Sequence, residues 1–138
     1  MNSFSVLIVD DEKEFLETLV KRLKKRKLDA KGAGNGENAL KMLKHNAVDV
    51  VVLDVRMPGM DGIETLREIK NDFPLTEVVM LTGHACMEVA VEGMEIGAFD
   101  YLMKPVDIDE LVYKLQDAYK KKLIHEEKIK NLERLKGN

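Results

Sequence analysis

Cysteine, aromatic residues and long apolar runs are scarce in this sequence, and each scarcity removes a class of protein. The single cysteine, Cys86, has no partner for an internal disulfide, which excludes a disulfide-stapled secreted scaffold. No stretch approaches the roughly 20 apolar residues that a membrane-spanning helix requires. Tryptophan is absent and aromatic residues make up 5% of the chain, so stacking on nucleobases is not expected as the main activity.

The start of the sequence has neither the basic region nor the long apolar stretch of a signal peptide, so we expect a cytoplasmic protein. The 138 residues include 45% hydrophobic and 34% charged side chains, which is an ordinary composition for a soluble globular domain. A chain of this length is sufficient for one domain that buries roughly two thirds of its extended-chain surface.

The net charge of −3 is unevenly distributed along the chain. Residues 120–138 hold seven Lys or Arg against three acidic residues, whereas the residues before them are acidic overall. A basic tail can bind nucleic acid or acidic lipid, but these charges are interleaved in sign, which favours a solvent-exposed helix face. We therefore expect this segment to make no direct contact with nucleic acid or with a membrane.

Short apolar runs alternate with amphipathic segments along the chain. Continuous β-branched runs are typical of strands buried on both faces, and apolar residues at three- and four-residue spacing predict helices. Strict alternation with short connections predicts an α/β fold: a doubly wound five-stranded parallel sheet with five helices, in the flavodoxin-like order 2-1-3-4-5. The predicted strands are residues 6–9, 50–53, 78–81 and 99–102, with a less buried edge strand at 28–33.

The last predicted helix, residues 107–136, is longer than the covering of a sheet requires. Roughly 30 residues of helix extend about 45 Å. We divide the chain into a domain at residues 1–120 and a helical extension or linker at residues 121–138. The apolar spacing through Ile129 and Leu132 is interrupted by Lys122 and His125, so the coiled-coil pattern is weak.

Polar side chains follow four of the predicted strands, at the edge where such sheets bind ligands. Asp10 and Asp11 follow the first strand, Asp54 the third, Thr82 the fourth and Lys104 the fifth. If the first and third strands are neighbours, three carboxylates converge, and two ionised carboxylates about 4 Å apart repel by roughly 4 kcal/mol at an effective dielectric near 20. Such a cluster binds a cation or raises a pKa, and Mg²⁺ suits a few carboxylates with water better than Ca²⁺ does.

The other two side chains indicate chemistry on a phosphoryl group. Lys104 can pair with an anion, and the Thr82 hydroxyl can donate to an oxygen of a transferred group. Phosphoryl transfer needs mainly positioning and neutralisation of charge. Asp54 is the candidate nucleophile, forming an aspartyl-phosphate, because it follows the most apolar strand and lies between the acidic pair and the Thr82 and Lys104 pair. The alternative for Asp10 and Asp11, capping of the first helix, is weaker beside this constellation.

Four motifs in this order and spacing resemble the receiver domain of two-component response regulators, over about residues 4 to 120. The resemblance implies that Asp54 accepts a phosphoryl group from a sensor histidine kinase or a histidine phosphotransfer protein. It also implies a phosphorylation-gated switch rather than an enzyme with a separate turnover substrate. The motifs are Leu7-Ile-Val-Asp-Asp-Glu12, Val52-Leu-Asp-Val-Arg-Met-Pro-Gly-Met-Asp-Gly62, Met80-Leu-Thr-Gly83 and Asp100-Tyr-Leu-Met-Lys-Pro105.

The same resemblance implies a ligand set for Mg²⁺. Asp11, Asp54 and the backbone carbonyl of Arg56 would hold the ion, and Asp10 would act largely through water.

It further implies how the phosphoryl group is contacted and detected. Thr82 and Lys104 would contact the phosphoryl oxygens, and Tyr101 would be the switch aromatic, which turns inward when Thr82 moves. Arg56 and His84 match the pair of positions that tunes self-dephosphorylation.

The sequence leaves open the assembly of the protein, the segment or partner that the switch controls, and two alternative functions. A homodimer through the fourth helix, fifth strand and fifth helix, or through the C-terminal helix, is one candidate assembly. We favour the front of a longer regulator over a stand-alone receiver. A phosphatase of the haloacid dehalogenase type also uses an Asp nucleophile, but it needs an acid two residues later, where Arg56 stands. A pseudo-receiver that never accepts phosphate is disfavoured by the complete set of five core residues.

Overall fold

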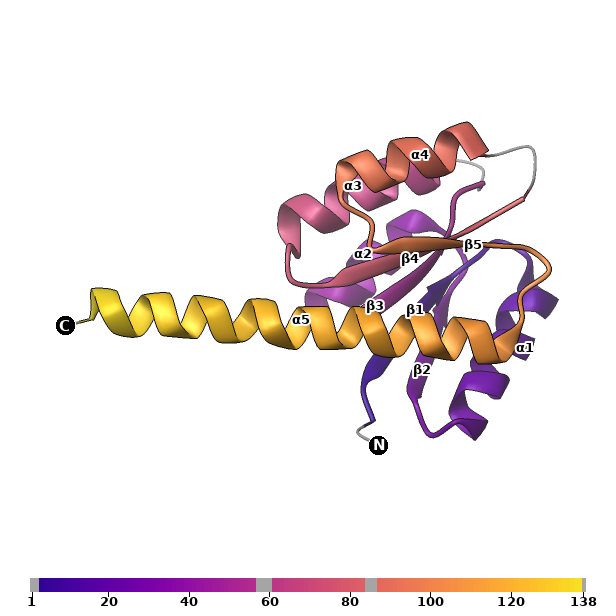
Figure 1. Ribbon diagram of the computed structural model, residues 1–138. Coiled ribbons are helices and arrows are strands. Elements are labelled where there is room, and N and C mark those ends of the chain that lie inside the picture. The colour runs from indigo at the N-terminus through magenta and orange to yellow at the C-terminus, as the bar shows by residue number, and fades with distance from the viewer. Residues whose placement is uncertain (1–2, 57–60, 84–86, 138) are drawn as a thin grey trace.

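The computed structural model describes residues 3–56, 61–83 and 87–137, and in that part of the chain five strands alternate with five helices (Figure 1). All neighbouring strands run parallel, in the order β2-β1-β3-β4-β5. The predicted fold class and strand order are therefore confirmed. The strands are β1 (Ser5–Val9), β2 (Asp29–Ala33), β3 (Val50–Asp54), β4 (Glu77–Thr82) and β5 (Asp100–Met103). The helices are α1 (Lys13–Lys25), α2 (Gly36–His45), α3 (Gly62–Asp72), α4 (Met87–Ile96) and α5 (Ile108–Lys136).

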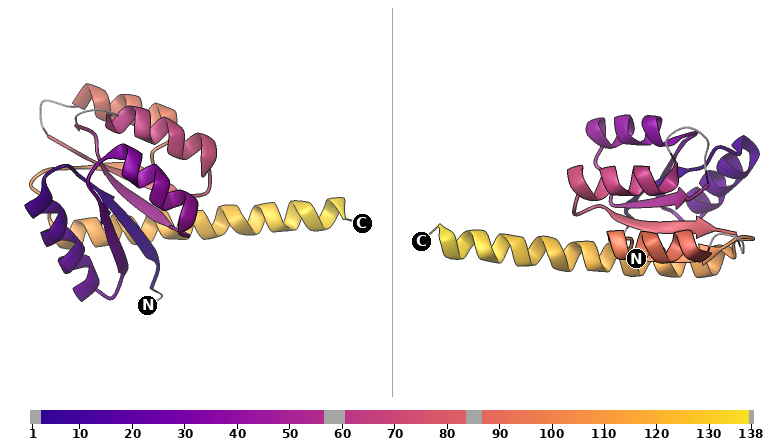
Figure 2. Two further views of the ribbon diagram at one scale, coloured as in Figure 1. Left: turned by 180° about the vertical axis from the view of Figure 1, so that it is seen from behind. Right: turned by 90° about the horizontal axis from the view of Figure 1, so that it is seen from above.

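The sheet separates two apolar layers, because successive side chains of a strand point to opposite faces. In β1, Val6 and Ile8 pack with α1 and α5, whereas Leu7 and Val9 pack with the opposite layer of α2 and α3. Figure 2 shows α1 and α5 on one side of the sheet and α2, α3 and α4 on the other. Every residue of β3 and β4 is buried, which is why these runs read as continuous apolar segments.

The observed elements differ from the predicted ones mostly at their ends. β4 and β5 extend to Thr82 and Met103, which brings them one residue closer to the site than predicted. Polar side chains cap the starts of three helices. Asn35 accepts a hydrogen bond from the Asn38 N–H at α2, Asp61 accepts from the Glu64 N–H at α3, and Asp107 accepts from two N–H groups at α5.

The fifth helix, α5, continues without interruption for 29 residues and projects beyond the sheet (Figure 1). Its first half is fixed by buried Leu111, Val112, Leu115 and Ala118. The predicted division at residue 120 falls inside this continuous helix and stays a prediction. No helix of the described residues is apolar and long enough to cross a membrane.

Ion pairs hold α5 where it leaves the sheet. Lys122 Nζ lies 2.5 Å from Asp49 Oδ1, just before β3, and Lys121 Nζ lies 3.8 Å from Glu77 Oε1, at the start of β4. Glu77 is buried, and Lys70 of α3 lies 3.9 Å from the same oxygen. The interpretation of the tail as a solvated face is therefore wrong for Lys122, whose side chain is 15% exposed because it pairs with Asp49.

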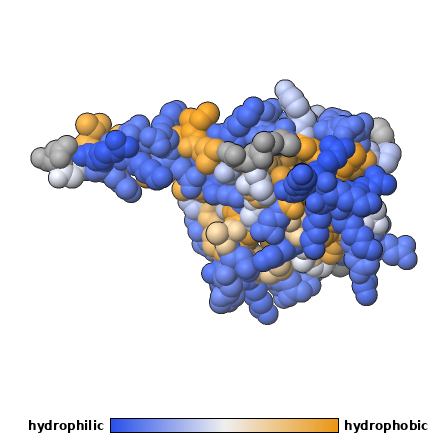
Figure 3. Space-filling model, turned by 90° about the horizontal axis from the view of Figure 1, so that it is seen from below, coloured by the Kyte–Doolittle hydropathy of each residue, from blue (hydrophilic) through white to orange (hydrophobic). Residues whose placement is uncertain are grey.

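Beyond Lys122, most side chains of α5 are exposed, as predicted, and half of residues 123–136 are charged. The space-filling view in Figure 3 shows apolar patches among charged surface on this projecting part. The exposed large apolar residues there are Leu123, Ile124, Leu132 and Leu135.

Candidate functional site

The register of the strands brings the predicted site residues to one edge of the sheet. Val9 pairs with Leu53, so the next residue of the chain, Asp10, lies at the level of Asp54. Thr82 pairs with Met103, and the Lys104 N–H donates to the Thr82 carbonyl at 2.8 Å. Short side chains at the ends of β1 and β3 can therefore meet a long side chain from the end of β5.

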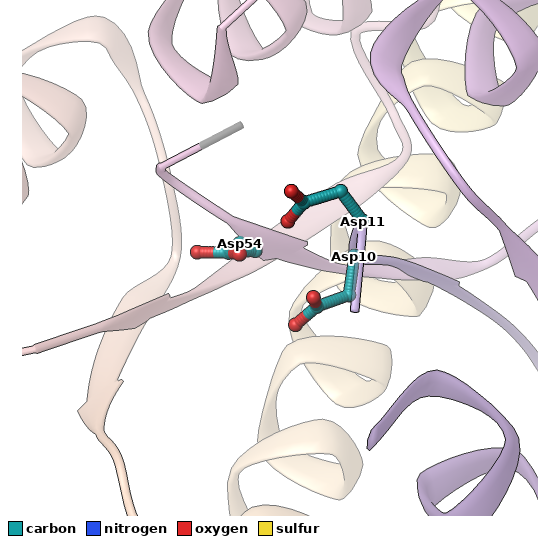
Figure 4. Close-up of side chains that lie close together, drawn as sticks. All are labelled: Asp10, Asp11 and Asp54. Atoms are coloured by element: carbon teal, nitrogen blue, oxygen red, sulfur yellow. The ribbon is translucent and has the colours of Figure 1, made fainter. Parts of the chain in front are cut away.

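Three carboxylates converge at this edge, as the sequence predicted. Asp10 and Asp11 come from the end of β1 and Asp54 from the end of β3, and one oxygen of each lies within 4.8 Å of the others (Figure 4). Asp10 and Asp54 are buried, whereas Asp11 is exposed. Hard oxygen ligands, close together and open to solvent on one side, fit the donor set that Mg²⁺ prefers.

Asp54 is held in place from two sides. Its Oδ1 accepts a hydrogen bond from the Arg56 N–H at 3.0 Å, and its Oδ2 lies 3.6 Å from Lys104 Nζ. The carboxylate is thus oriented by the loop that follows β3, while one oxygen faces the ammonium group. The sequence predicted a metal-binding carbonyl and a tuning role for Arg56, but it did not reveal that the Arg56 N–H orients the Asp54 carboxylate.

Asp10 forms the inner wall of the site. Its side chain is 0% exposed, its Oδ2 accepts from Lys104 Nζ at 3.1 Å and its Oδ1 accepts from the Glu12 N–H at 2.9 Å. The residue before α1 is Glu12, which makes no side-chain capping hydrogen bond. Asp10 therefore lies outside α1 and faces the other carboxylates, which disfavours a purely capping role.

Thr82 lies at this edge, whereas Tyr101 lies two residues before the end of β5, where it pairs with Met80. Thr82 is buried at the end of β4, and its hydroxyl donates to the Gly83 carbonyl at 3.1 Å. Tyr101 of β5 is partly buried and packs against the apolar layer formed with α2, α3 and α4. His84, the other predicted tuning residue, lies outside the described residues, as do Cys86 and residues 57–60 of the second motif.

Two residues that the sequence did not assign to the site contact it closely. Phe15 of α1 places its ring 4.5 Å from Lys104 Nζ. Gly62, the first residue of α3, is buried so tightly that a Cβ there would lie 2.7 Å from the Asp54 carbonyl oxygen. The sequence carried no specific signal for Phe15, because its spacing in α1 is that of an ordinary apolar helix face.

Burial raises the pKa of Asp54 above its usual range, and the neighbouring carboxylates of Asp10 and Asp11 raise it further. The Arg56 N–H and the Lys104 ammonium oppose this change without cancelling it. A cluster that raises the pKa of a carboxyl group is one that a bound cation would stabilise.

We expect Asp54→Asn to stabilise the fold at neutral pH in magnesium-free buffer. An acid whose pKa is raised in the folded state binds its proton more tightly there than in the unfolded chain, so its contribution to the free energy of unfolding falls as the pH rises through the raised pKa. The variant is therefore expected to be more stable than the wild type at pH 7, and this difference in the free energy of unfolding is expected to shrink on acidification. Urea unfolding of both proteins between pH 4 and pH 7 measures this difference. A difference that is independent of pH would contradict the raised pKa of Asp54.

The doubly wound parallel sheet and the acidic cluster at its carboxyl edge are the features that the sequence motifs predicted for a receiver domain. A comparison with protein families gives the same result. The model of the response regulator receiver domain matches residues 6–116. The chain therefore belongs to the response regulator receiver domain family, and this membership supports a role in signalling by phosphoryl acceptance.

Individual relatives and structures extend this comparison. The chain is 41% identical over 113 residues to the regulatory protein AtoC of Escherichia coli K12, which corresponds to 82% of this chain and 24% of AtoC. It thus spans about a quarter of the length of this curated relative. A receiver domain structure from Clostridium thermocellum matches with a TM-score of 0.84 and 32% identity, over 88% of this chain and 98% of that one. The structure of NtrX from Brucella abortus matches with a TM-score of 0.87 and 29% identity, over 95% of this chain and 30% of NtrX.

Proposed function

We propose that the chain is a phosphorylation-gated switch in which Asp54 accepts a phosphoryl group from a phosphohistidine. The observation that supports this most is the convergence of Asp10, Asp11 and Asp54 with the Lys104 ammonium, which lies 3.1 Å from Asp10 and 3.6 Å from Asp54. Neutralising cations around an oriented carboxylate are what phosphoryl transfer requires.

The proposed step conserves atoms and charge. A carboxylate oxygen of Asp54 forms a bond to phosphorus while the bond between phosphorus and the imidazole nitrogen of the donor breaks. The electron pair of the broken bond stays on that nitrogen, which takes up a proton, and Asp54 becomes an acyl phosphate. Lys104 and Thr82 would donate hydrogen bonds to the phosphoryl oxygens.

Asp10, Asp11, Asp54 and the backbone carbonyl of Arg56 would hold Mg²⁺ at this edge. When bound, the ion would neutralise part of the charge on the phosphoryl oxygens. The three convergent oxygens and the raised pKa of Asp54 support this assignment.

The proposed readout is a change of surface packing around β5. A phosphoryl group on Asp54 would give the Thr82 hydroxyl a charged acceptor in place of the Gly83 carbonyl, and Tyr101 would repack in response. Arg56 and His84 are proposed to tune how fast the acyl phosphate hydrolyses. The chain would then serve as a switch without a separate turnover substrate.

A sensor histidine kinase or histidine phosphotransfer protein is the proposed donor, and residues 1–120 are the proposed receiver with residues 121–138 as its linker. The NtrX match supports the linker, because it covers more of this chain than the Clostridium receiver does and belongs to a longer protein. A homodimer through α4, β5 and α5 or through the projecting part of α5 is also proposed. The exposed apolar side chains that support it are Met87, Val91 and Met94 on α4 and Leu132 and Leu135 on α5.

Intact mass after incubation with phosphoramidate, whose bond from phosphorus to nitrogen imitates phosphohistidine, tests the proposed acceptor. We expect one added phosphoryl group on the wild type with Mg²⁺, and none without Mg²⁺ or on Asp54→Asn. Reduction with borohydride, which traps an acyl phosphate, distinguishes rapid hydrolysis from a lack of reaction. No adduct and no trapped product on the wild type would favour the pseudo-receiver instead.

A further inference from the structure

Among the described residues, two carboxylates at salt-bridge distance and one aromatic ring lie against the Lys104 ammonium. Asp10 and Asp54 approach it from β1 and β3, at 3.1 and 3.6 Å. The third neighbour is the face of the Phe15 ring, whose centroid is 4.5 Å from Nζ. Phe15 is partly buried and packs against the apolar layer between the sheet, α1 and α5, so the ring is held from behind.

A lysine needs such support because its stem is long and flexible. Fixing a lysine side chain costs conformational entropy, and the Lys104 side chain is 25% exposed at the rim of the site. An aromatic face attracts a cation through its quadrupole when the charge lies within about 6 Å of the ring centroid. The distance observed here is well inside that limit.

An aromatic face also differs from a carboxylate because it attracts the ammonium group without accepting a directional hydrogen bond. An ammonium carries three N–H donors, and a third carboxylate would engage one of them in a directional hydrogen bond. The ring attracts the positive charge without such a bond. The ammonium can therefore turn from Asp54 towards an incoming phosphoryl oxygen while it keeps its contact with Asp10.

We propose that Phe15 is a positioning residue for phosphoryl transfer, whose ring holds the Lys104 ammonium between Asp10 and Asp54 and leaves an N–H donor available to the phosphoryl group. This inference rests on the proposed function of Asp54. It assigns to the first turn of α1 a direct electrostatic role in the site, in addition to its packing role.

A series of fluorinated phenylalanines at position 15 tests this inference, because fluorine weakens the negative face of the ring while its size changes little. We expect the initial rate with phosphoramidate and Mg²⁺ to fall stepwise from Phe to trifluoro-Phe, by about two- to fivefold in total. Phe15→Tyr is expected to keep the wild-type rate, and Phe15→Leu to match trifluoro-Phe.

Three controls separate this role from packing and from docking of a donor protein. Leu16→Ala removes a partly buried neighbour on the same helix that packs against the same layer, and its rate is expected to equal that of the wild type. In a Lys104→Met background the fluorinated series is expected to show no trend, because the cation is gone. A small donor is essential, because Phe15 also lines a 220 Å³ groove with Thr18 and Val106, where a protein partner could bind.

Proton NMR of the Lys104 ε-methylene group provides a readout that is independent of activity. We expect ring-current shielding of this group in the wild type and in Phe15→Tyr, and its loss in Phe15→Leu. If the wild type is phosphorylated normally and the rate is the same for every fluorinated phenylalanine at position 15, the proposed role of Phe15 is overturned and the proposed function of Asp54 is not. Absence of any adduct on the wild type would overturn the proposed function, whatever the NMR spectrum shows.

Discussion

Replacing Lys104 with methionine is expected to slow phosphorylation of Asp54 by about 100-fold. Lys104 is the cationic side chain that contacts both Asp10 and Asp54, and removal of one preorganised donor to a developing charge typically costs about 100- to 1000-fold in rate. Methionine keeps the length and the apolar stem of the side chain, so the loss reports on the charge. The initial rate of mass gain with phosphoramidate and Mg²⁺ measures the effect.

The same substitution is expected to destabilise the fold, by roughly 3 kcal/mol, because it leaves the buried Asp10 carboxylate without its ammonium partner. The double variant Lys104→Met/Asp10→Asn removes both charges and is expected to regain most of that stability. Its phosphorylation should stay as slow as in the single variant. Recovery of the phosphorylation rate together with stability would mean that Lys104 acts only by neutralising Asp10.

Gly62→Ala is expected to have the second large effect, although residue 62 carries no reactive group. A Cβ at this position would lie 2.4 Å from the Val55 Cα and 2.7 Å from the Asp54 carbonyl oxygen, and both are backbone atoms that cannot rotate away. We expect a loss of about 3 kcal/mol in the free energy of unfolding as α3 is forced off the end of β3. Phosphorylation should slow as well, because displacement of a reacting group by about 1 Å can cost 100-fold.

Gly34→Ala is the matched control for this substitution. Gly34 follows β2, its backbone has no positive φ, and a Cβ there would meet no heavy atom within 4 Å. The change should leave phosphorylation unaltered and stability unchanged, or increased by up to about 1 kcal/mol. Equal urea midpoints for the two variants would show that α3 can move away from Asp54 at little cost.

The sequence was sufficient for the elements and for the acidic part of the site. Buried parallel strands contain apolar residues on both faces, so β3 and β4 were evident as continuous runs. Once β1 and β3 are neighbours, the position of Asp10 and Asp54 at the strand ends follows from the parallel register. These features depend on local pattern and topology, which a single sequence carries.

The contacts that cross between elements could not be read in the same way. Phe15 has the spacing of an ordinary core residue of α1, and nothing local reveals that its ring meets a lysine from the far end of the sheet. Lys122 belongs to a run of alternating charges, yet it pairs with Asp49 across 73 residues of sequence. Both contacts depend on the angle at which a helix crosses the sheet, which hydrophobic periodicity leaves undetermined.

Because α5 is attached to the sheet along its first half and projects beyond it, a small tilt of the helix moves its C-terminal end by a larger distance. The ion pairs at Lys121 and Lys122 act as the last anchor, and the 14 residues beyond them, 123–136, extend about 21 Å without another support from the sheet (Figure 1). A tilt of about 10° at the anchor would carry the tip sideways by about 4 Å. A small change in the packing of side chains beneath the first half of α5 would therefore move the C-terminal end of the helix by a distance comparable to the length of a side chain.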